Sequence, residues 1–360
     1  MKRKYFLSSI LIILVMLSAC KKQSVSTDNE FHLSTAVNEL QEEIEQNLRI
    51  DAKVHNPKSE KYANYRANIT FYEDKELMKS IFFENSENLE FPETDGLLIK
   101  ASDGLFHSYV TILYLTTQYQ KIYEKVLLNA SQPCYENPID FGDAPISDEL
   151  SNMTKKEALQ EVEELKLALS LPLEEIPSVC NALNWDTFQY IVENGEMHSY
   201  SEEEINWEIE QDEGIYYMGY RYLFEDEYVM NGNYSSSSNV GNSGSEKGSY
   251  LTVCVNSKGI QYLSTVMNYE ETEQVGEPEN IVGLDTVVEQ IKEYYKNTII
   301  SNALTVKNIE FCYVPRLYET GVASCEMIPA WVVYVESEPS KYGLISGELI
   351  KINAITGEIM

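Results

Sequence analysis

The chain has 360 residues, a length that suggests two or three domains at roughly 100–200 residues each. It carries 27 Lys and Arg against 58 Asp and Glu, which gives a formal net charge of -31. This charge argues against nucleic acid as a partner, because phosphate binding needs a basic surface, and against attraction to anionic lipid headgroups. Hydrophobic residues make up 43% of the chain, enough to build cores, so the composition excludes wholesale disorder.

Residues 1–20 have the organisation of a secretion signal. The cations Lys2–Lys4 precede an apolar stretch from Phe6 to Leu17. That stretch is shorter than the ~20 residues that cross a bilayer, and it has the length of the apolar part of a signal peptide. It ends in Leu17-Ser18-Ala19-Cys20.

These four residues resemble the lipobox of bacterial lipoproteins at every position. The resemblance implies that a diacylglyceryl group joins the sulfur of Cys20, that the signal is cleaved after Ala19, and that acyl chains such as palmitate anchor the mature chain. Two acyl chains hold a protein stably where one is marginal. We therefore expect a cell-membrane protein on the extracytoplasmic face, with residues 21–30 as a polar tether. An ordinary signal peptide or a short N-terminal anchor helix is the alternative.

Five cysteines follow Cys20, and an odd number cannot all pair within one chain. They have neither C-x-x-C spacing nor zinc-ligand spacing with a nearby His. Cys254 lies in a strand-like segment, where a small buried thiol is the ordinary interpretation. Cys312 and Cys325 flank a turn-like stretch and could form a disulfide in an oxidising exterior, which the sequence leaves open. The five are Cys134, Cys180, Cys254, Cys312 and Cys325.

An N-terminal α+β domain is predicted over residues 31–150. Its first element is a helix over Phe31–Asn47, because apolar residues recur there at helical spacing from Leu33 to Leu48. Residues 131–150, rich in Pro and turn formers, are the best candidate boundary. A short helix is expected at Glu73–Phe83, and strands are expected at Tyr62–Tyr72, Gly96–Lys100 and Tyr109–Tyr119.

A second unit is predicted over residues 151–273. Thr154-Lys-Lys-Glu157 has the capping-box pattern, and Met153 can pack on Ala158. The loop Asn231–Ser249, rich in Ser, Gly and Asn, is expected to be mobile. The helix that follows the capping box has one apolar face, formed by Ala158, Val162, Leu165 and Leu169. Strands are expected at Ile215–Phe224, Glu227–Met230, Tyr250–Val255 and Ile260–Met267.

A third unit is predicted over residues 274–360. It begins with an amphipathic helix from Leu284 to Tyr295, for which Asp285 is a plausible cap. Strands follow at Val306–Val314, Ala330–Val335 and Glu348–Ile352, and a tight turn ends the chain. A helix followed by antiparallel strands thus occurs twice, which indicates an internal duplication over residues 151–360. The predicted fold class is α+β, with antiparallel sheets each packed by helices.

The C-terminal segment Lys351–Ile359 looks like the closing turn of PepSY-type modules, with Asn353 in place of the usual Asp. Pro329–Tyr334 resembles the penultimate strand of those modules. Two such units behind an N-terminal anchor are similar to extracytoplasmic regulators of the YycI and YycH type, and to uncharacterised lipoproteins of Firmicutes. The resemblance implies a non-catalytic module that binds or restrains a protein partner.

Motifs of enzyme chemistry do not emerge from the sequence. The four histidines have no metal-binding spacing, and the acidic runs 202–204 and 208–213 lack the order of an EF-hand loop. We therefore expect no catalytic residue, cofactor or metal. The alternatives are a lipoprotein that captures a sugar or peptide solute, and an extracytoplasmic hydrolase with two carboxylates in one cleft. Aromatic residues could line a sugar-binding face, although Trp185, Trp207 and Trp331 are more economically explained as core or sheet residues.

Overall fold

The structure is a computed structural model, and it describes most of the chain from residue 30 onward. The described residues are 30–70, 72, 74–83, 88–93, 97–101, 104–109, 112–117, 144–194, 214–232, 246, 248–266, 268–318, 324–338 and 347–360. The predicted signal, Ala19, Cys20 and the tether 21–29 lie outside these residues. So do most of the candidate boundary and the centre of the predicted mobile loop, at 233–245.

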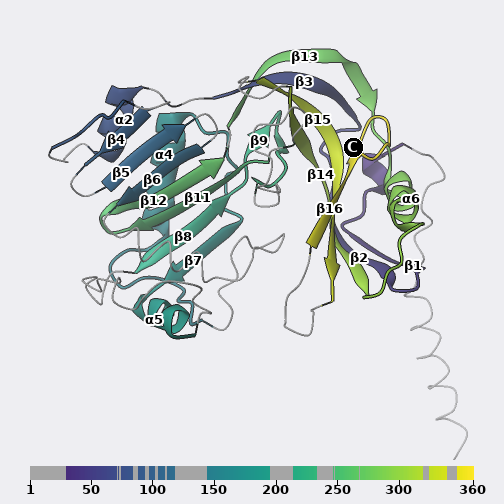
Figure 1. The fold of residues 1–360 in the computed structure, drawn as a ribbon, viewed down its shortest axis with the longest axis horizontal. Helices are drawn as coiled ribbons and strands as arrows, with labels where there is room; N and C mark the ends of the chain where they lie inside the picture. The colour runs from purple at the N-terminus through teal and green to yellow at the C-terminus, as the bar shows by residue number, and fades with distance from the viewer. Residues whose placement is uncertain are drawn as a thin grey trace, which may run out of the picture.

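The fold contains two large sheets (Figure 1). The first sheet has the order β1-β2-β14-β15-β3-β13, and β16 also pairs with β15. Its strands are β1 (Glu39–Glu45), β2 (Leu48–His55), β3 (Lys61–Ile69), β13 (Tyr269–Asn280), β14 (Leu304–Leu317), β15 (Ser324–Ser337) and β16 (Gly347–Asn353). Most neighbours are antiparallel, but β14 and β2 run parallel.

The second sheet has the order β4-β5-β6-β12-β11-β8-β7, with every pair antiparallel. Its strands are β4 (Leu97–Lys100), β5 (Gly104–Tyr109), β6 (Ile112–Thr117), β7 (Val179–Leu183), β8 (Ile215–Tyr220), β11 (Tyr250–Asn256) and β12 (Gly259–Val266). A small hairpin of β9 (Leu223–Phe224) and β10 (Glu227–Tyr228) lies between the two sheets (Figure 1).

Four α-helices and one short 3-10 helix accompany the sheets in the described part of the chain. They are η1 (Leu33–Thr35), α2 (Lys75–Phe82), α4 (Lys155–Leu169), α5 (Trp185–Asn194) and α6 (Leu284–Tyr295). Helix α4 packs against β11 and β12, and α6 packs against β16. The α+β class predicted from the sequence is confirmed. We call the first sheet with α6 the first lobe, and the second sheet with α2, α4 and α5 the second lobe.

The helix predicted over Phe31–Asn47 is wrong, because this segment forms η1 and strand β1, which pairs with β2 as a hairpin. Apolar residues four apart lie on one face of a helix, but they also lie on one face of a strand, where the side-chain period is two. Leu40 and Ile44 lie on one face of strand β1, and both pack against the core. Asn47 turns the hairpin with a positive φ of 68°, a conformation that Asn adopts more readily than most residues.

Most other predicted elements are confirmed with shifted ends. The predicted long strand Tyr109–Tyr119 is instead the end of β5 and the whole of β6, two paired strands. The capping box of α4 is present: Thr154 Oγ1 accepts a hydrogen bond from the Glu157 backbone N–H at 3.3 Å, and Glu157 Oε2 accepts one from the Thr154 N–H at 2.8 Å. Asp285 does not cap α6, since the N-cap is Gly283.

The predicted segment boundaries do not coincide with the division into sheets. Strands β1, β2 and β3 belong to the first sheet, whereas β4, β5 and β6 belong to the second, although all six come from the predicted domain 31–150. Likewise β13 begins within the predicted unit 151–273 but pairs with β3 in the first sheet. The pattern within a strand predicts which face is buried but not which distant strand will pair with it, so a division by sequence blocks misses this exchange.

The predicted order of a helix followed by antiparallel strands occurs in both units of the predicted duplication, but their topologies differ. Each unit has a helix followed by an antiparallel meander, β7-β8-β11-β12 after α4 and β14-β15-β16 after α6. The added strands join differently, since β6 runs antiparallel to the last strand of one meander and β2 runs parallel to the first strand of the other. One shared topology for the whole units is wrong for another reason: α5 and the β9–β10 hairpin are inserted between strands of the first meander and have no counterpart among the described residues of the second. The superposition of the meanders stays a prediction.

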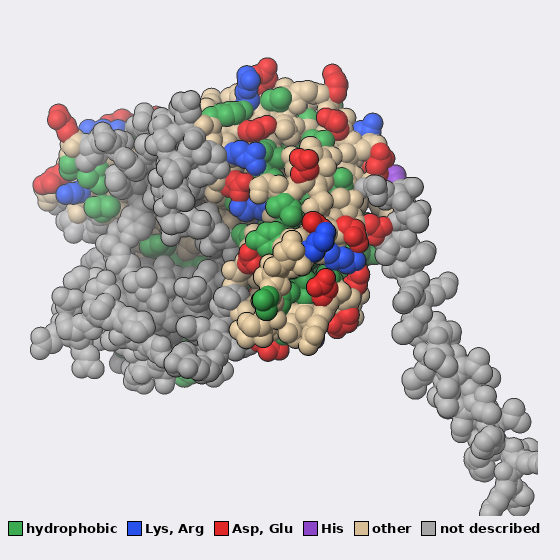
Figure 2. Space-filling view, turned by 45° about the vertical axis from the view of Figure 1, so that its right-hand side comes forward, with side chains coloured by type: hydrophobic (Ala, Val, Ile, Leu, Met, Phe, Trp, Pro, Cys, Tyr) green, Lys and Arg blue, Asp and Glu red, His purple; other side chains and the backbone are tan. Residues whose placement is uncertain are grey.

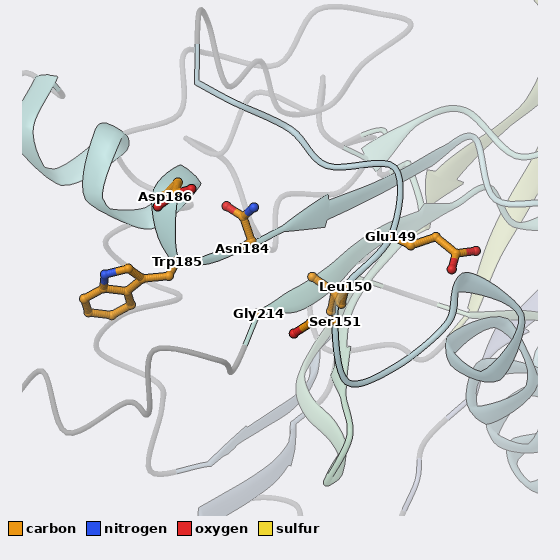
Figure 3. Close-up of a pocket in the computed structure, with 7 residues that line it drawn as sticks. All are labelled: Glu149, Leu150, Ser151, Asn184, Trp185, Asp186 and Gly214. Atoms are coloured by element: carbon orange, nitrogen blue, oxygen red, sulfur yellow. The ribbon is translucent and has the colours of Figure 1, made fainter.

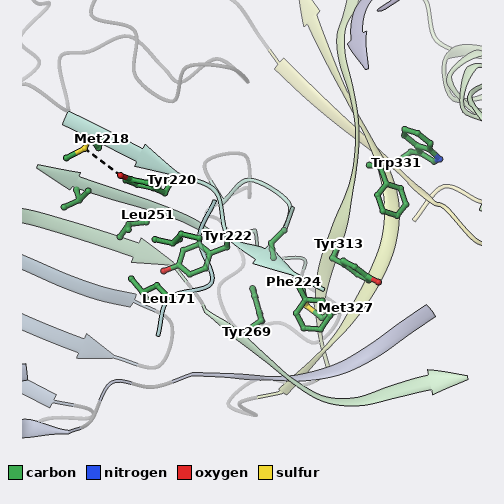
Figure 4. Close-up of a cluster of buried hydrophobic side chains, with 14 of the residues drawn as sticks. Leu171, Met218, Tyr220, Tyr222, Phe224, Leu251, Tyr269, Tyr313, Met327 and Trp331 are labelled. Carbon is green, nitrogen blue, oxygen red and sulfur yellow. Dashed lines mark hydrogen bonds between the residues drawn. The ribbon is translucent and has the colours of Figure 1, made fainter. Parts of the chain in front are cut away.

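A large hydrophobic cluster contains side chains from both lobes. It includes Leu165 of α4 and Ile291 of α6, and aromatic side chains around the β9–β10 hairpin connect the two sides. Figure 4 shows this region, where Phe224 lies near Tyr313 with ring centroids 5.1 Å apart. Because this cluster includes side chains of both lobes, the lobes share part of the burial that stabilises each of them.

Candidate functional site

The junction between the lobes is built around the β9–β10 hairpin. The segment after β10 pairs with the first sheet, as the Met230 N–H donates to the Tyr313 carbonyl at 2.9 Å. The hairpin turns through Glu225 and Asp226, with φ of 49° and 63°. Positive φ at both central residues is the geometry of a type I′ turn, whose twist matches paired strands.

A buried ion pair crosses this junction. The Arg221 guanidinium donates two parallel hydrogen bonds to the Glu310 carboxylate on β14, at 2.8 and 3.0 Å. The side chains are only 8% and 2% exposed. Arg221 also donates to the Val229 carbonyl at 2.9 Å and stacks on the Tyr228 ring, with its central carbon 4.6 Å from the centroid. Bidentate geometry with additional partners is the arrangement that offsets desolvation of two charges.

A second buried carboxylate, Glu227, joins the hairpin to the start of β3. Its Oε1 accepts from the Lys58 backbone N–H at 2.7 Å and from the Tyr62 hydroxyl. Burial raises the pKa of the Glu227 carboxyl, although these two hydrogen bonds and the nearby Lys58 charge act to lower it. The same burial raises the pKa of Tyr62.

Both carboxylates are therefore engaged with fixed partners at the junction. A general acid or base needs access to a reacting group, and these side chains face protein groups instead. The junction is an arrangement that holds two sheets in one relative position. It was missed at the sequence level because Arg221 and Glu310 are far apart in the chain.

A cavity of about 530 Å³ lies at the end of the second sheet, beside the start of α5 (Figure 3). This volume falls within the ~300–1,000 Å³ that small-molecule sites occupy. The strap before α4, the end of β7 with the start of α5, and the residue before β8 contribute to it. The lining residues are Glu149, Leu150, Ser151, Asn184, Trp185, Asp186 and Gly214.

Local hydrogen bonds fix the wall of this cavity. The Asn184 carboxamide oxygen accepts from the Thr187 N–H at 3.0 Å, and its nitrogen donates to Ser147 Oγ at 2.6 Å. Gly214 forms part of the floor, where a Cβ would come within 2.7 Å of the Leu183 carbonyl oxygen. Only glycine allows this close approach.

The two acidic side chains of the cavity do not converge. Figure 3 shows the Glu149 side chain directed away from Asp186, on the opposite side of Leu150. A glycosidase needs its two carboxyl groups on either side of one bond. The cavity is therefore a place where an aromatic ring, an amide and one hydroxyl group could contact a solute, rather than a carboxylate pair set for hydrolysis.

The residues singled out in the sequence are scattered in the structure. Trp185 is half-buried at the cavity, whereas Trp331 is buried and donates to the Val282 carbonyl at 3.0 Å. Of the histidines, His32 lies 3.8 Å from Glu60, and His55 is exposed at the end of β2. Ala19, Cys20, Trp207, His198 and both acidic runs lie outside the described residues.

The possible disulfide between Cys312 and Cys325 does not form. On the paired strands β14 and β15, Cys325 lies opposite Leu317, five residues from Cys312. Five residues along a strand span about 16 Å and place the two side chains on opposite faces, whereas a disulfide needs Cα atoms within about 7 Å. Cys254 is buried as predicted.

Charged side chains are spread over the first lobe. Figure 2 shows acidic groups interspersed with Lys and Arg on this face, without one continuous patch of either sign. Within the described residues, no group of three or more His, Cys, Asp or Glu side chains is placed to hold a metal ion. None of the helices in that part of the chain is long and apolar enough to cross a bilayer.

These features define a two-lobed α+β protein with a buried ion pair at its junction and a cavity beside α5. No protein-family model matches the chain, and no curated protein matches it. A solved structure shares the fold: the crystal structure of an uncharacterized protein from Eubacterium rectale ATCC 33656 matches with a TM-score of 0.65. The match covers 92% of this chain and 96% of that chain at 15% sequence identity, which shows the fold alone.

Proposed function

We propose that the protein is a lipoprotein, anchored through Cys20 to the extracytoplasmic face of the cell membrane, and that its body binds or regulates a protein partner without catalysis. The observation that carries the anchor is Leu17-Ser18-Ala19-Cys20 directly after a short apolar stretch. The thiol of Cys20 supplies the nucleophile for a thioether, and the small residues before it give a peptidase access to the backbone.

Two observations support a binding role. The polar groups of the junction have fixed partners across the lobes, so the body offers a constant shape. The closing turn that resembles PepSY modules has the expected tight geometry, because Asn353 Oδ1 accepts from the N–H groups of Ile355 and Thr356 at 2.9 and 3.0 Å. Pre-organised surfaces lose little entropy when a partner binds.

The anchor is tested by Cys20→Ala with membrane fractionation and mass spectrometry of the N-terminal peptide. We expect the wild type in the membrane fraction with a lipid-modified Cys20, and the variant unprocessed or released to the medium. Cys180→Ala is the matched control, since this thiol lies in the folded body and its loss should leave the location unchanged. A Cys20→Ala protein that stays membrane-bound with its signal removed would contradict the proposal.

The partner is tested by crosslinking in intact membranes followed by affinity purification. We expect one protein to be enriched with the lipidated wild type and to be lost when Cys20→Ala releases the body. Equal recovery of background proteins from both samples would argue against a membrane-associated partner.

A second candidate function is capture of a sugar or peptide solute, and the cavity beside α5 favours it. Trp185 offers an aromatic face, and Asn184 and Ser151 offer polar groups for orientation. Calorimetric titration with neutral oligosaccharides and short peptides tests it. Binding that Trp185→Ala abolishes would support this function, and no heat from any of these solutes would eliminate it.

A further inference from the structure

The point where the tether enters the folded body is fixed by several contacts. Glu30 forms a β-bridge with Val282, and the Phe31 N–H donates to the Ile281 carbonyl at 2.8 Å. The Asn280 side chain donates to Glu30 Oε2 at 2.8 Å. These contacts place the first described residue beside the start of α6, on the first lobe.

The packing of Phe31 makes this attachment firm. Its side chain is buried, and its ring centroid lies 5.9 Å from that of Trp331, which is itself in the core. The backbone also approaches closely, because a Cβ on Gly283 would stand 3.0 Å from the Glu30 carbonyl oxygen. Residues 30–31 therefore move with the first lobe.

The chain outside this attachment is short. Nine residues lie between Cys20 and Glu30, so the ten steps from one to the other span at most about 35 Å when fully extended. A compact body of this length has a radius of gyration of about 20 Å and is therefore about 50 Å across. The tether is too short for the far lobe to exchange places with the near one at the bilayer.

Charge acts on the distance between the first lobe and the bilayer. Strand β1 exposes several carboxylates on the first lobe, of which Glu42 lies 3.4 Å from Lys292 of α6. An acidic surface is repelled by anionic headgroups, so these carboxylates oppose close contact between the first lobe and anionic lipid. The orientation therefore depends on the attachment and length of the tether and not on charge. The four acidic residues of β1 are Glu39, Glu42, Glu43 and Glu45.

We propose that the first lobe faces the bilayer and that the second lobe, with the cavity beside α5, points away from it. This orientation rests on the proposed lipid anchor at Cys20. It presents the surfaces of the second lobe to partners or solutes outside the membrane, and it restricts contacts of the first lobe to partners close to the bilayer.

Energy transfer tests the orientation. The lipidated full-length protein is reconstituted into phosphatidylcholine vesicles that carry an acceptor-labelled lipid, with Cys134 and Cys180 replaced by Ser. Donors are attached in turn at Ile299→Cys in the first lobe and Leu77→Cys in the second, positions 95% and 38% exposed. Because the tether reach of ~35 Å is shorter than the ~50 Å body, transfer should be about twofold or more higher from position 299.

A lengthened tether provides the matched control. An insertion of flexible Gly-Ser residues between Thr27 and Asp28 should reduce the difference between the two donor positions. Equal transfer from both positions in the wild type, or higher transfer from position 77, would overturn the orientation, and so would a difference that the insertion leaves unchanged. Failure of the lipid anchor gives a separate result, because the protein would then not float with the vesicles at all.

Discussion

Helices α4 and α6 occupy corresponding places in the two lobes. Each lies against an antiparallel meander, and each buries one apolar face, with Ala158, Val162, Leu165 and Leu169 on α4 and Val287, Val288, Ile291 and Tyr295 on α6. Their N-termini differ. Helix α4 begins with a complete capping box, whereas α6 begins at Gly283 without a side-chain cap.

The attachment of the N-terminal segment explains this difference. The space beside Gly283 is occupied by the Glu30 backbone, so a capping side chain would be crowded there. At the N-terminus of α4, the side chains of Thr154 and Glu157 accept hydrogen bonds from backbone N–H groups of the same segment. An apolar face therefore determines where a helix packs, while the neighbouring chain determines how the N–H groups at its end find hydrogen-bond partners.

The largest expected effect comes from placing a carboxylate in either helix–sheet contact. Leu165→Asp or Ile291→Asp would bury an unpaired charge, and each should cost more than about 4 kcal/mol of unfolding free energy. Because the hydrophobic cluster joins both lobes, we expect both to lose hydrogen-exchange protection together. Urea unfolding and exchange mass spectrometry measure this.

Leu167→Asp is the matched control on the same helix. Its side chain is 73% exposed, so the identical substitution should change stability by less than about 0.5 kcal/mol. If Leu165→Asp unfolded the second lobe alone, the two lobes would be energetically independent. That result would contradict the expectation that the shared hydrophobic cluster couples their stability.

The junction should show the next largest effect. Arg221→Met leaves the Glu310 carboxylate buried without its guanidinium, and breaking such a pair costs roughly 3–5 kcal/mol. The double variant Arg221→Met/Glu310→Leu removes both charges, so we expect it to recover much of the lost stability. Chemical denaturation of the single and double variants tests this, and a double variant as unstable as the single one would contradict it.

Sequence reasoning succeeded where local chemistry decides the structure. The capping box at Thr154, the hairpin around residues 250–266 and the final turn at Asn353 each depend on residues within one short segment. It failed at Phe31–Asn47, where four-residue spacing fits both a helix and a strand.

The remaining features of the fold and of the candidate site depend on contacts between segments that are far apart in the chain. The contact between Arg221 and Glu310 joins residues 89 apart in the chain, and β3 pairs with β13 and β15 from the opposite end of the sequence. The cavity beside α5 likewise needs three separate segments. No local pattern contains these associations, so the candidate solute site could not be assembled from the sequence, whereas the proposed lipidation at Cys20 rests on four consecutive residues.

A smaller effect should separate the two helix N-termini. Thr154→Ala removes the side-chain acceptor for the Glu157 N–H and should cost about 1 kcal/mol, while Thr154→Ser should retain most of the stability. Gly283→Ala should instead displace Glu30 and raise hydrogen exchange at Phe31, with little fraying of α6. Hydrogen exchange measured residue by residue tests this contrast between Thr154→Ala and Gly283→Ala. The prediction is contradicted if Gly283→Ala raises exchange only in α6 and leaves Phe31 protected.

The smallest effect is expected at Glu227, the junction carboxylate without a guanidinium partner. Its pKa is raised in the folded protein from an ordinary value of about 4.5 by burial, so the folded state holds this proton more tightly than the unfolded state. Stability from this group therefore falls as pH rises from about 4.5 through the raised pKa and stays constant above it. Glu227→Gln keeps an oxygen to accept hydrogen bonds from the Lys58 N–H and the Tyr62 hydroxyl but cannot ionise.

The stability of the Glu227→Gln variant relative to the wild type should accordingly increase with pH across that window. Urea unfolding between about pH 4 and pH 8 would measure this change. Tyr62→Phe sharpens the test, since loss of a hydrogen bond that lowers the pKa of Glu227 should extend the window upward. A difference between Glu227→Gln and the wild type that does not change with pH would show that this carboxylate is no more costly to ionise than one in water, and the contrast with the paired Glu310 would disappear.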